Sequence, residues 1–174
     1  MDELLGNLRR HGVAFVVDVR SSPHSRFNPD FSRLPLESAL AEAGLRYVFM
    51  GDLLGGRPQD PACYRDGKVD YERVKMTAAF RRGIDRLKDA WRKELRICIL
   101  CSEGQPERCH RSKLIGTVLD GSGIPVQHIA PDGSLRSQEE VVRRLTGGQK
   151  SLFGTAFTSR KRYRPGTAGG AESG

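Results

Sequence analysis

The sequence lacks several features that define whole classes of protein. It has no apolar run long enough to cross a bilayer, and its first residues, Met-Asp-Glu-Leu-Leu, do not form a secretory signal. Its four cysteines among 174 residues are spaced unlike the disulfide framework of a small secreted protein. No internal repeat is present, and neither the Walker nor the Rossmann glycine pattern occurs. We therefore expect a cytoplasmic protein without a membrane segment.

The charge of the chain is strongly positive and unevenly distributed. The formal net charge is +8. Residues 147–174 contain five basic residues and one acidic residue, so about half of the excess lies in this glycine-rich end. The composition predicts a folded domain over residues 1–146 and a basic, disordered tail over residues 147–174. Such a tail binds nucleic acid in some proteins and only maintains solubility in others, and charge alone leaves both readings open.

Apolar runs alternate with helical periodicity along residues 1–146. This alternation predicts an α/β domain with a mostly parallel sheet, covered by helices on both faces in three layers. Strands are expected at 14–19, 45–50, 95–100 and 125–129, and helices at 2–11, 35–43, 70–93, 112–119 and 137–145. Residues 51–67 are expected to form a long loop. Ser137 with Glu140 three residues later is a capping pattern for the last helix.

The residues with reactive side chains cluster at the expected carboxyl ends of the strands. Because ligands of parallel α/β sheets bind beyond these ends, we expect the residues to share one pocket. The sharpest candidate is Cys101, a thiol that directly follows an apolar strand and faces the expected start of a helix. Backbone N–H groups and the helix dipole favour negative charge there, so the position suits a thiolate nucleophile or a bound phosphate. The alternative is an ordinary buried cysteine.

Ten residues around this pocket receive expected roles. Those expected to take part in catalysis are Cys101, Glu103 and His110, and those expected to bind a substrate or anion are Asp18, Arg20, Ser25, Arg57, Cys109, Arg111 and His128. Guanidinium groups suit bidentate recognition of phosphate or carboxylate. The alternative for the arginines is pairing with Asp18, Glu103 or Asp52, which would fix the loops. For each histidine the alternative is a hydrogen-bonded structural imidazole.

A metal site is a competing interpretation of the same residues. Cys101, Cys109 and His110 offer ligands for zinc, with Glu103, His24 or His128 as a fourth. The Cys-x7-Cys-His spacing, however, lacks the short separation between cysteines that is typical of structural zinc sites. We therefore expect no cofactor and keep zinc as the alternative.

A short peptide in the expected tail is the second distinctive feature. Gln149, Leu152 and Phe153 resemble the peptide by which bacterial DNA-processing proteins dock on the sliding clamp. In that mode apolar anchors fill a groove while the glutamine supplies hydrogen bonds, and a flexible carrier lets the peptide fit. The alternative explanation for aromatic residues in this region, Phe153 and Phe157, is that the tail folds back onto the domain.

Several motifs together resemble a known family. They are Asp18-Val19-Arg20 with Pro23 and Ser25, Phe31, Leu54-Gly55-Gly56, Cys101-x-Glu103 with Cys109-His110-Arg111, and His128-Ile129. Over residues 3–146 the sequence is similar to the domain of unknown function 488 family. The resemblance implies a compact α/β domain with the motif residues at its site, and no established reaction. Family members usually have a strand before the first helix. Two explanations stay open here: either the given start lies late, or this strand is absent and the sheet has one strand fewer.

Local likeness to two other enzyme classes widens the choice of function. The order of strand, Cys101, loop and Arg108 is similar to that in rhodaneses and cysteine phosphatases, although six residues separate Cys101 from Arg108 where the phosphatases have five. We expect a DNA-associated protein with an anion-binding pocket, namely an enzyme that processes nucleic acid or a nucleotide, for example in repair, and that the clamp peptide recruits. The alternatives are a non-catalytic phosphate-binding module and a rhodanese-like sulfurtransferase that uses Cys101.

Overall fold

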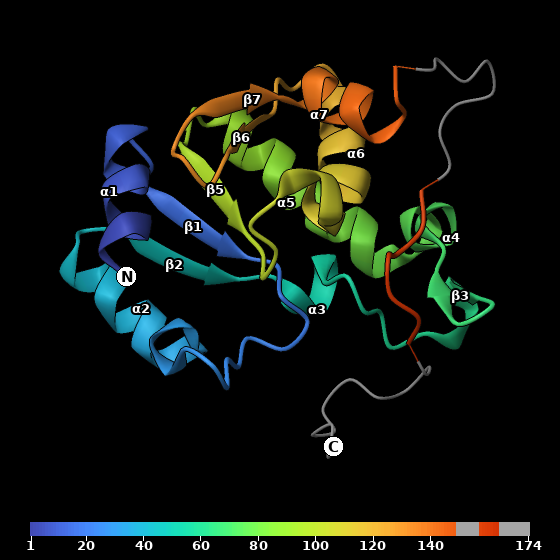
Figure 1. Cartoon of the computed structure of the whole chain (residues 1–174), viewed down its shortest axis with the longest axis horizontal. Helices are drawn as coiled ribbons and strands as arrows, with labels where there is room; N and C mark the ends of the chain where they lie inside the picture. Colours follow the sequence, from blue (N-terminus) through green and yellow to red (C-terminus); the bar gives the residue numbers. More distant parts are fainter. Residues whose placement is uncertain (149–156, 164–174) are drawn as a thin grey trace.

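A three-stranded parallel sheet forms the centre of the protein. The structure, a computed structural model, describes residues 1–148 and 157–163. The strands of the sheet are ordered β2-β1-β5 and comprise β1 (Phe15–Asp18), β2 (Arg46–Phe49) and β5 (Ile97–Leu100) (Figure 1). Phe15 pairs with Arg46 on one side and with Ile97 on the other, so the three strands end at the same edge. The three apolar strands predicted for these regions are confirmed, each shorter than predicted.

Helices and hairpins connect and flank these strands. The α-helices are α1 (Asp2–Arg10), α2 (Arg33–Glu42), α3 (Gly51–Leu54), α4 (Tyr71–Met76), α5 (Ala78–Arg92), α6 (Thr117–Asp120) and α7 (Gln138–Leu145). Shorter helical segments are the 3-10 turns η1 (Pro29–Phe31), η2 (Pro61–Cys63) and η3 (Pro106–Arg108), and the π-helical η4 (Arg111–Gly116). The hairpins pair β3 (Tyr64–Arg65) with β4 (Lys68–Val69), and β6 (Gln127–Ile129) with β7 (Leu135–Ser137). No helix in the described part of the chain is long and apolar enough to cross a membrane.

Successive side chains of the central strands enter two separate hydrophobic clusters. Val16 on β1 packs in one cluster with Leu8 of α1 and Leu40 of α2. Val17, its neighbour, packs in the other cluster with Ile84 of α5. Because side chains of a strand point alternately to opposite faces, α1 and α2 cover one face of the sheet and α5 covers the other (Figure 1). The near-continuous apolar character of the strands follows from burial on both faces.

The fourth predicted strand does not join the parallel sheet. Its last three residues form β6, which pairs antiparallel with β7, Gln127 lying opposite Ser137. A tight turn with Gly133 at φ 78° links the two strands, and a partner so close in sequence is available at little cost in chain entropy. Ser137 then caps α7, since its side chain accepts a hydrogen bond from the backbone N–H of Glu140 at 3.1 Å, as the capping pattern predicts.

The long helix predicted over 70–93 is two helices. Thr77 between α4 and α5 has extended backbone, and its hydroxyl accepts a hydrogen bond from the N–H of Phe80 at 3.2 Å. A threonine in this role begins a new helix although the apolar stripe continues across it. The predicted helix over 112–119 is likewise divided into η4 and α6. The predicted loop over 51–67 contains α3, η2 and β3.

Residues 157–163 lie against the β3–β4 hairpin and the start of α4. The backbone N–H of Ser159 donates to the carbonyl of Val69 at 3.0 Å, and the N–H of Tyr163 donates to that of Gly67 at 2.6 Å. For these seven residues the structure shows the folded-back arrangement that the sequence left as the alternative. The clamp-like peptide, Gln149, Leu152 and Phe153, lies outside the described residues.

Candidate functional site

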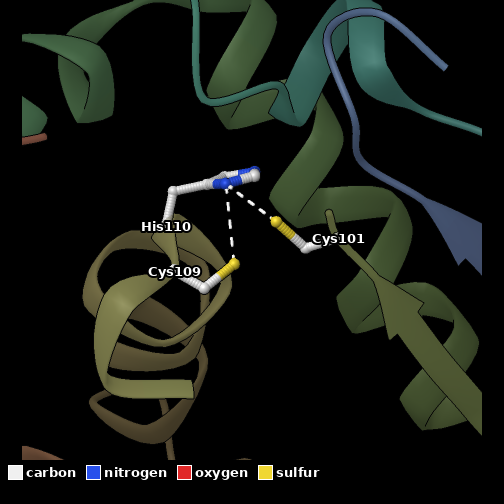
Figure 2. A group of neighbouring side chains, drawn as sticks. All are labelled: Cys101, Cys109 and His110. Carbon is white, nitrogen blue, oxygen red and sulfur yellow. Dashed lines mark hydrogen bonds between the residues drawn. The ribbon is translucent and has the colours of Figure 1, made fainter. Parts of the chain in front are cut away.

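Cys101 lies directly after β5, at the edge where the strands of the sheet end. Its Sγ atom is 3.5 Å from Nδ1 of His110, and the Sγ of Cys109 is 3.9 Å from the same nitrogen (Figure 2). The ligand atoms of the three side chains all lie within 4.8 Å of one another. The structure thus brings together three of the residues that the sequence assigned to one pocket.

The loop that returns the chain to Cys101 is held by local hydrogen bonds. The buried hydroxyl of Ser112 contacts the carbonyls of Pro106 and Cys109. The backbone N–H of Arg111 donates to the Sγ of Cys109 at 3.4 Å, where η4 begins. The π-helical geometry of η4 makes the first turn after Cys109 wider than an α-helical turn. Such π-helical turns are frequent at functional sites. A helical periodicity in the sequence does not distinguish this geometry from an α-helix.

The two thiols of the site differ in acidity. A hydrogen bond from Cys109 lowers the pKa of Cys101; burial opposes this effect, and His110 lowers the pKa further. Burial and the neighbouring Cys101 sulfur raise the pKa of Cys109. Of the two thiols, Cys101 is therefore the one that ionises more readily. Cys98 on β5 is different again, because burial raises the pKa of its thiol.

Gly56 lies against the ring of His110. A Cβ atom at position 56 would be 2.9 Å from Nδ1 and 3.0 Å from Cγ of this ring. The sequence predicts a tight turn at Gly55-Gly56. Because Gly56 has no side chain, the backbone there can also approach the His110 ring closely. The second ring nitrogen, Nε2, is buried without a hydrogen-bond partner among the described residues. Buried polar atoms are normally paired, so this exception marks the ring as a functional candidate.

Two cavities meet at Cys101. The larger is a cleft of about 1230 Å³, and the fully exposed Phe27 is among its lining residues. The smaller has a volume of about 220 Å³ and is lined by Cys109 and His110. Cys101 and Glu103 line both. A substrate that occupies both cavities would therefore pass the Cys101 sulfur.

Asp18 and Arg20 form a closed ion pair at the end of β1. Nε of Arg20 donates to Oδ1 of Asp18 at 2.9 Å, and Nη2 donates to Oδ2 at 2.6 Å. The hydroxyl of Tyr47 donates to the same Oδ2 at 2.7 Å, and Nη1 of Arg20 donates to the carbonyl of Phe31 at 2.6 Å. Both charged side chains are buried. The structure thus shows for Arg20 the alternative of pairing with Asp18, in which the guanidinium fixes a loop.

Three further candidates for anion binding line the larger cavity. The hydroxyl of Ser25 accepts from the N–H of Asn28 at 3.2 Å and so shapes its own loop. Nη2 of Arg111 donates to the carbonyl of Gly104 at 3.0 Å. The exposed guanidinium of Arg57 is 4.7 Å from the centroid of the Tyr163 ring and lines both cavities. Because a guanidinium carries five N–H donors, Arg111 retains donors beyond this contact.

Glu103 and His128 have different surroundings from each other. Oε1 of Glu103 lies 3.3 Å from Nη2 of Arg160, at the edge of the site. Nε2 of the buried His128 is 2.7 Å from Oε1 of Gln138, and burial lowers the pKa of the imidazole. His128 lines neither of the two cavities. For His128 the structure therefore shows the alternative of a structural imidazole.

The sulfurs and the imidazole at Cys101 form a donor set that suits zinc. Two cysteines and one histidine are a known catalytic combination, in which the fourth position is open to water or substrate. In the described part of the chain, these three residues are the one cluster with ligand atoms close enough to hold a metal ion. None of the predicted fourth ligands, Glu103, His24 and His128, belongs to it.

Sequence reasoning missed one wall of the smaller cavity. This wall includes Arg160, Lys161 and Tyr163, from the region interpreted as a disordered tail. Tyr71, at the start of α4, also lines the cavity, and burial raises the pKa of its phenol. The one signal available in the sequence was an aromatic residue in the tail, Phe157, which packs against the hydrophobic core.

Comparison with protein families matches residues 1–118 to the family described as Domain of unknown function DUF488. The chain belongs to this family. Neither the search of curated proteins nor that of solved structures found a match. The matched region ends within α6, so it contains Cys101, Cys109 and His110 but not residues 157–163. The family resemblance read from the motifs is confirmed, and the wall formed by the tail lies beyond the matched region.

Proposed function

We propose that this protein is a thiol-dependent enzyme that acts on nucleic acid or a nucleotide, with Cys101 as its nucleophile. One observation carries the proposal: the Sγ atom of Cys101 lies 3.5 Å from Nδ1 of His110, in a position that lines two cavities. A cysteine paired with a histidine within reach is the arrangement that activates thiol nucleophiles. The thiol of Cys109 supports the thiolate through its hydrogen bond.

The reaction proceeds in two steps on this arrangement. The Cys101 sulfur forms a bond to an electrophilic atom of the substrate, and the leaving group departs with its bonding electrons and a proton from Nδ1 of His110. The neutral imidazole then takes a proton from a water molecule, whose oxygen attacks the intermediate and releases the Cys101 thiolate. The partly buried ring of His110 is held for both transfers by its packing against Gly56.

The larger cavity supports a nucleotide or nucleic acid as the substrate. Its lining residues include Arg57 and Arg111, whose guanidinium groups suit phosphate oxygens. The fully exposed ring of Phe27 is available for stacking against a base. An exposed aromatic side chain near cations is the combination that single-stranded nucleic acids recognise.

Recruitment by a sliding clamp is a separate part of the proposal. It rests on the sequence of Gln149, Leu152 and Phe153. Because residues 157–163 pack on the domain, the sharp test replaces the peptide residues by alanine and leaves the rest of the chain in place. We expect loss of binding to the clamp in surface plasmon resonance, with the variant as stable as the original chain. Undiminished binding would remove this part of the proposal.

A rhodanese-like sulfurtransferase is the second candidate, and the neighbouring thiols favour it. A persulfide on Cys101 would have the Cys109 thiol beside it. Attack by that thiol on the inner sulfur would form a Cys101–Cys109 disulfide and release the outer sulfur as hydrosulfide, which carries away the electrons of the broken S–S bond. Incubation with thiosulfate followed by mass spectrometry distinguishes the candidates. One added sulfur atom on Cys101 supports the transferase, and its absence favours the nucleic-acid enzyme.

The test of the nucleophile is the pH dependence of Cys101 alkylation. Iodoacetamide would be applied to the Cys63→Ser/Cys98→Ser chain with and without a chelator, and mass spectrometry would locate the label. Because the pKa of Cys101 is lowered, we expect the rate to reach its plateau well below the roughly pH 8.5 of a free thiol. Cys109→Ala removes the supporting hydrogen bond and should move the plateau to higher pH.

The same experiment can reject the proposal. An ordinary pH profile in the original chain would make Cys101 a structural residue. Protection that the chelator removes would identify a metal site in place of a free nucleophile. The first result would leave the non-catalytic binding module as the remaining function, whereas the second would favour metal-based chemistry at the same three residues.

A further inference from the structure

Residues 157–163 add an outer strand-like segment to the β3–β4 hairpin, beside α4 (Figure 1). Thr158 forms an antiparallel bridge with Asp70. The N–H of Val69 donates to the hydroxyl of Ser159 at 2.9 Å, and that hydroxyl donates to the carbonyl of Lys161 at 2.7 Å. Ser159 is buried, so the middle of this segment is fixed on the domain.

Side chains at both ends of the segment reinforce this attachment. Phe157 and Tyr163 pack against the larger hydrophobic cluster of the domain. The guanidinium of Arg57 lies over the ring of Tyr163, 4.7 Å from its centroid. The segment therefore contacts the loop after α3 as well as the hairpin, and it has a defined position next to the site.

The smaller cavity lies between this segment and the Cys101 loop. Arg160 and Lys161 line it from the segment, and Arg20, Arg57 and Arg108 line it from the family domain. Arg20 is already paired with Asp18. Against the other four cations the lining contains one carboxylate, that of Glu103. The phenol of Tyr71 remains protonated because burial raises its pKa, so it is available as a donor. The lining is chemically suited to an anion.

The pair between Arg160 and Glu103 removes an obstacle to anion binding. A lone carboxylate in the Cys101 loop would repel a phosphate. Oε1 of Glu103 lies 3.3 Å from Nη2 of Arg160, and both side chains are partly exposed. A guanidinium carries five N–H donors, so Arg160 can contact a phosphate with the others while it stays paired with Glu103.

We propose that residues 157–163 complete an anion-binding subsite beside Cys101, which takes a phosphate-sized group through Arg160 and Lys161. The volume of about 220 Å³ admits such a group and is smaller than the roughly 300–1,000 Å³ of pockets for whole drug-sized ligands. The remainder of the substrate then occupies the larger cleft, with its reacting atom at the Cys101 sulfur. This assignment of the reacting atom rests on the proposed function, whereas the subsite itself does not.

The subsite combines residues of the matched family region with residues that lie beyond it. The matched region, residues 1–118, supplies Arg57, Arg108 and the Cys101 loop. Two of the four cations come from a segment about 40 residues beyond its end. The family domain thus carries the thiol chemistry, and the added segment selects an anionic group next to it.

The test measures binding of inorganic phosphate to the full chain by phosphorus NMR at low ionic strength. Arg160→Gln is compared with Arg162→Gln, which removes the same charge from the same segment but lines neither cavity. We expect the dissociation constant for phosphate to rise about tenfold in Arg160→Gln, as for loss of a charge-assisted contact. Arg162→Gln should bind phosphate as the original chain does. Lys161→Gln should show a smaller rise.

Three results would overturn the subsite. These are no saturable phosphate binding by the original chain, unchanged binding in Arg160→Gln, or equal weakening in both arginine variants, which would reflect net charge alone. The alkylation profile of Cys101 separates this outcome from failure of the proposed function. An ordinary thiol with Arg160-dependent phosphate binding would reject the nucleophile and retain the subsite.

Discussion

The ends of β1 and β5 lie side by side in the sheet, yet the polar side chains at the two ends differ in how completely they are hydrogen-bonded and buried. Asp18 on β1 is paired in register with Leu100 on β5, one residue before Cys101. At the β1 end each group of the Asp18–Arg20 pair is hydrogen-bonded and buried. At the β5 end the Cys101 sulfur lines two cavities, and Nε2 of His110 has no partner among the described residues.

The contrast separates a structural network from a reactive site. Two charges taken out of water cost several kcal/mol each, and only complete pairing offsets that cost. Asp18 and Arg20 meet this requirement with each other, Tyr47 and the Phe31 carbonyl. A site that must bind and react retains groups with capacity for new bonds, as around Cys101. Charge and position at a strand end therefore do not identify function until the pairing is known.

We expect the largest effect from Asp18→Asn, which removes the acidic partner of the buried ion pair at the end of β1. Loss of the carboxylate charge leaves the Arg20 guanidinium buried without its counter-ion. We expect the free energy of unfolding in urea to fall by about 3–5 kcal/mol. Asp52→Asn, at an exposed position, is the control and should change it little. A loss under about 1 kcal/mol would show that the pair is not essential to the fold.

Gly56→Ala should have the next largest effect and should act on both stability and chemistry. The new Cβ would lie 2.9 Å from Nδ1 of His110, so the ring must move. We expect a loss of about 2 kcal/mol in stability, as for an overpacked interior, together with slower alkylation of Cys101 below pH 7. Gly104→Ala adds the same atom where no other atom lies within 4 Å. Equal behaviour of the two variants would contradict the role given to the Gly56 contact.

Tyr47→Phe tests whether the two strand ends are independent, because it removes one hydrogen bond to Asp18 and leaves the ion pair with Arg20 in place. Oδ2 of Asp18 loses the phenol but keeps its bond to Nη2 of Arg20. We expect a loss of about 1 kcal/mol in the free energy of unfolding, and no change in the pH profile of Cys101 alkylation. An altered alkylation profile would show that the two strand ends are coupled.

Cys101→Ser should have the smallest effect on stability. Its sulfur is only partly buried and contributes little to the hydrophobic cluster beside it. We expect the free energy of unfolding in reducing buffer to change by less than about 1 kcal/mol, while the fast-reacting thiol disappears. A loss as large as that of Asp18→Asn would mean that the sulfur holds the fold together.

The sequence predicted those elements whose signal is local. The apolar runs that became β1, β2 and β5 were recognisable because strands buried on both faces need apolar residues throughout. The residues of a strand do not by themselves show which strand it will pair with. The run at 125–129 therefore looked like a strand of the central sheet, but it pairs with Leu135–Ser137. Thr77 likewise divided a continuous apolar stripe, since capping depends on its backbone geometry.

The sequence by itself determined that Cys101 follows a buried strand and that Cys109, His110 and Arg111 open the next helical segment. It also determined the family, through motifs within residues 1–118. Only the tertiary structure decided that Tyr47 donates to Asp18, that the His110 ring lies against Gly56, and that Arg160 pairs with Glu103. Residue order fixes which side chains are near in the chain, whereas contacts between distant segments follow from how the whole core packs.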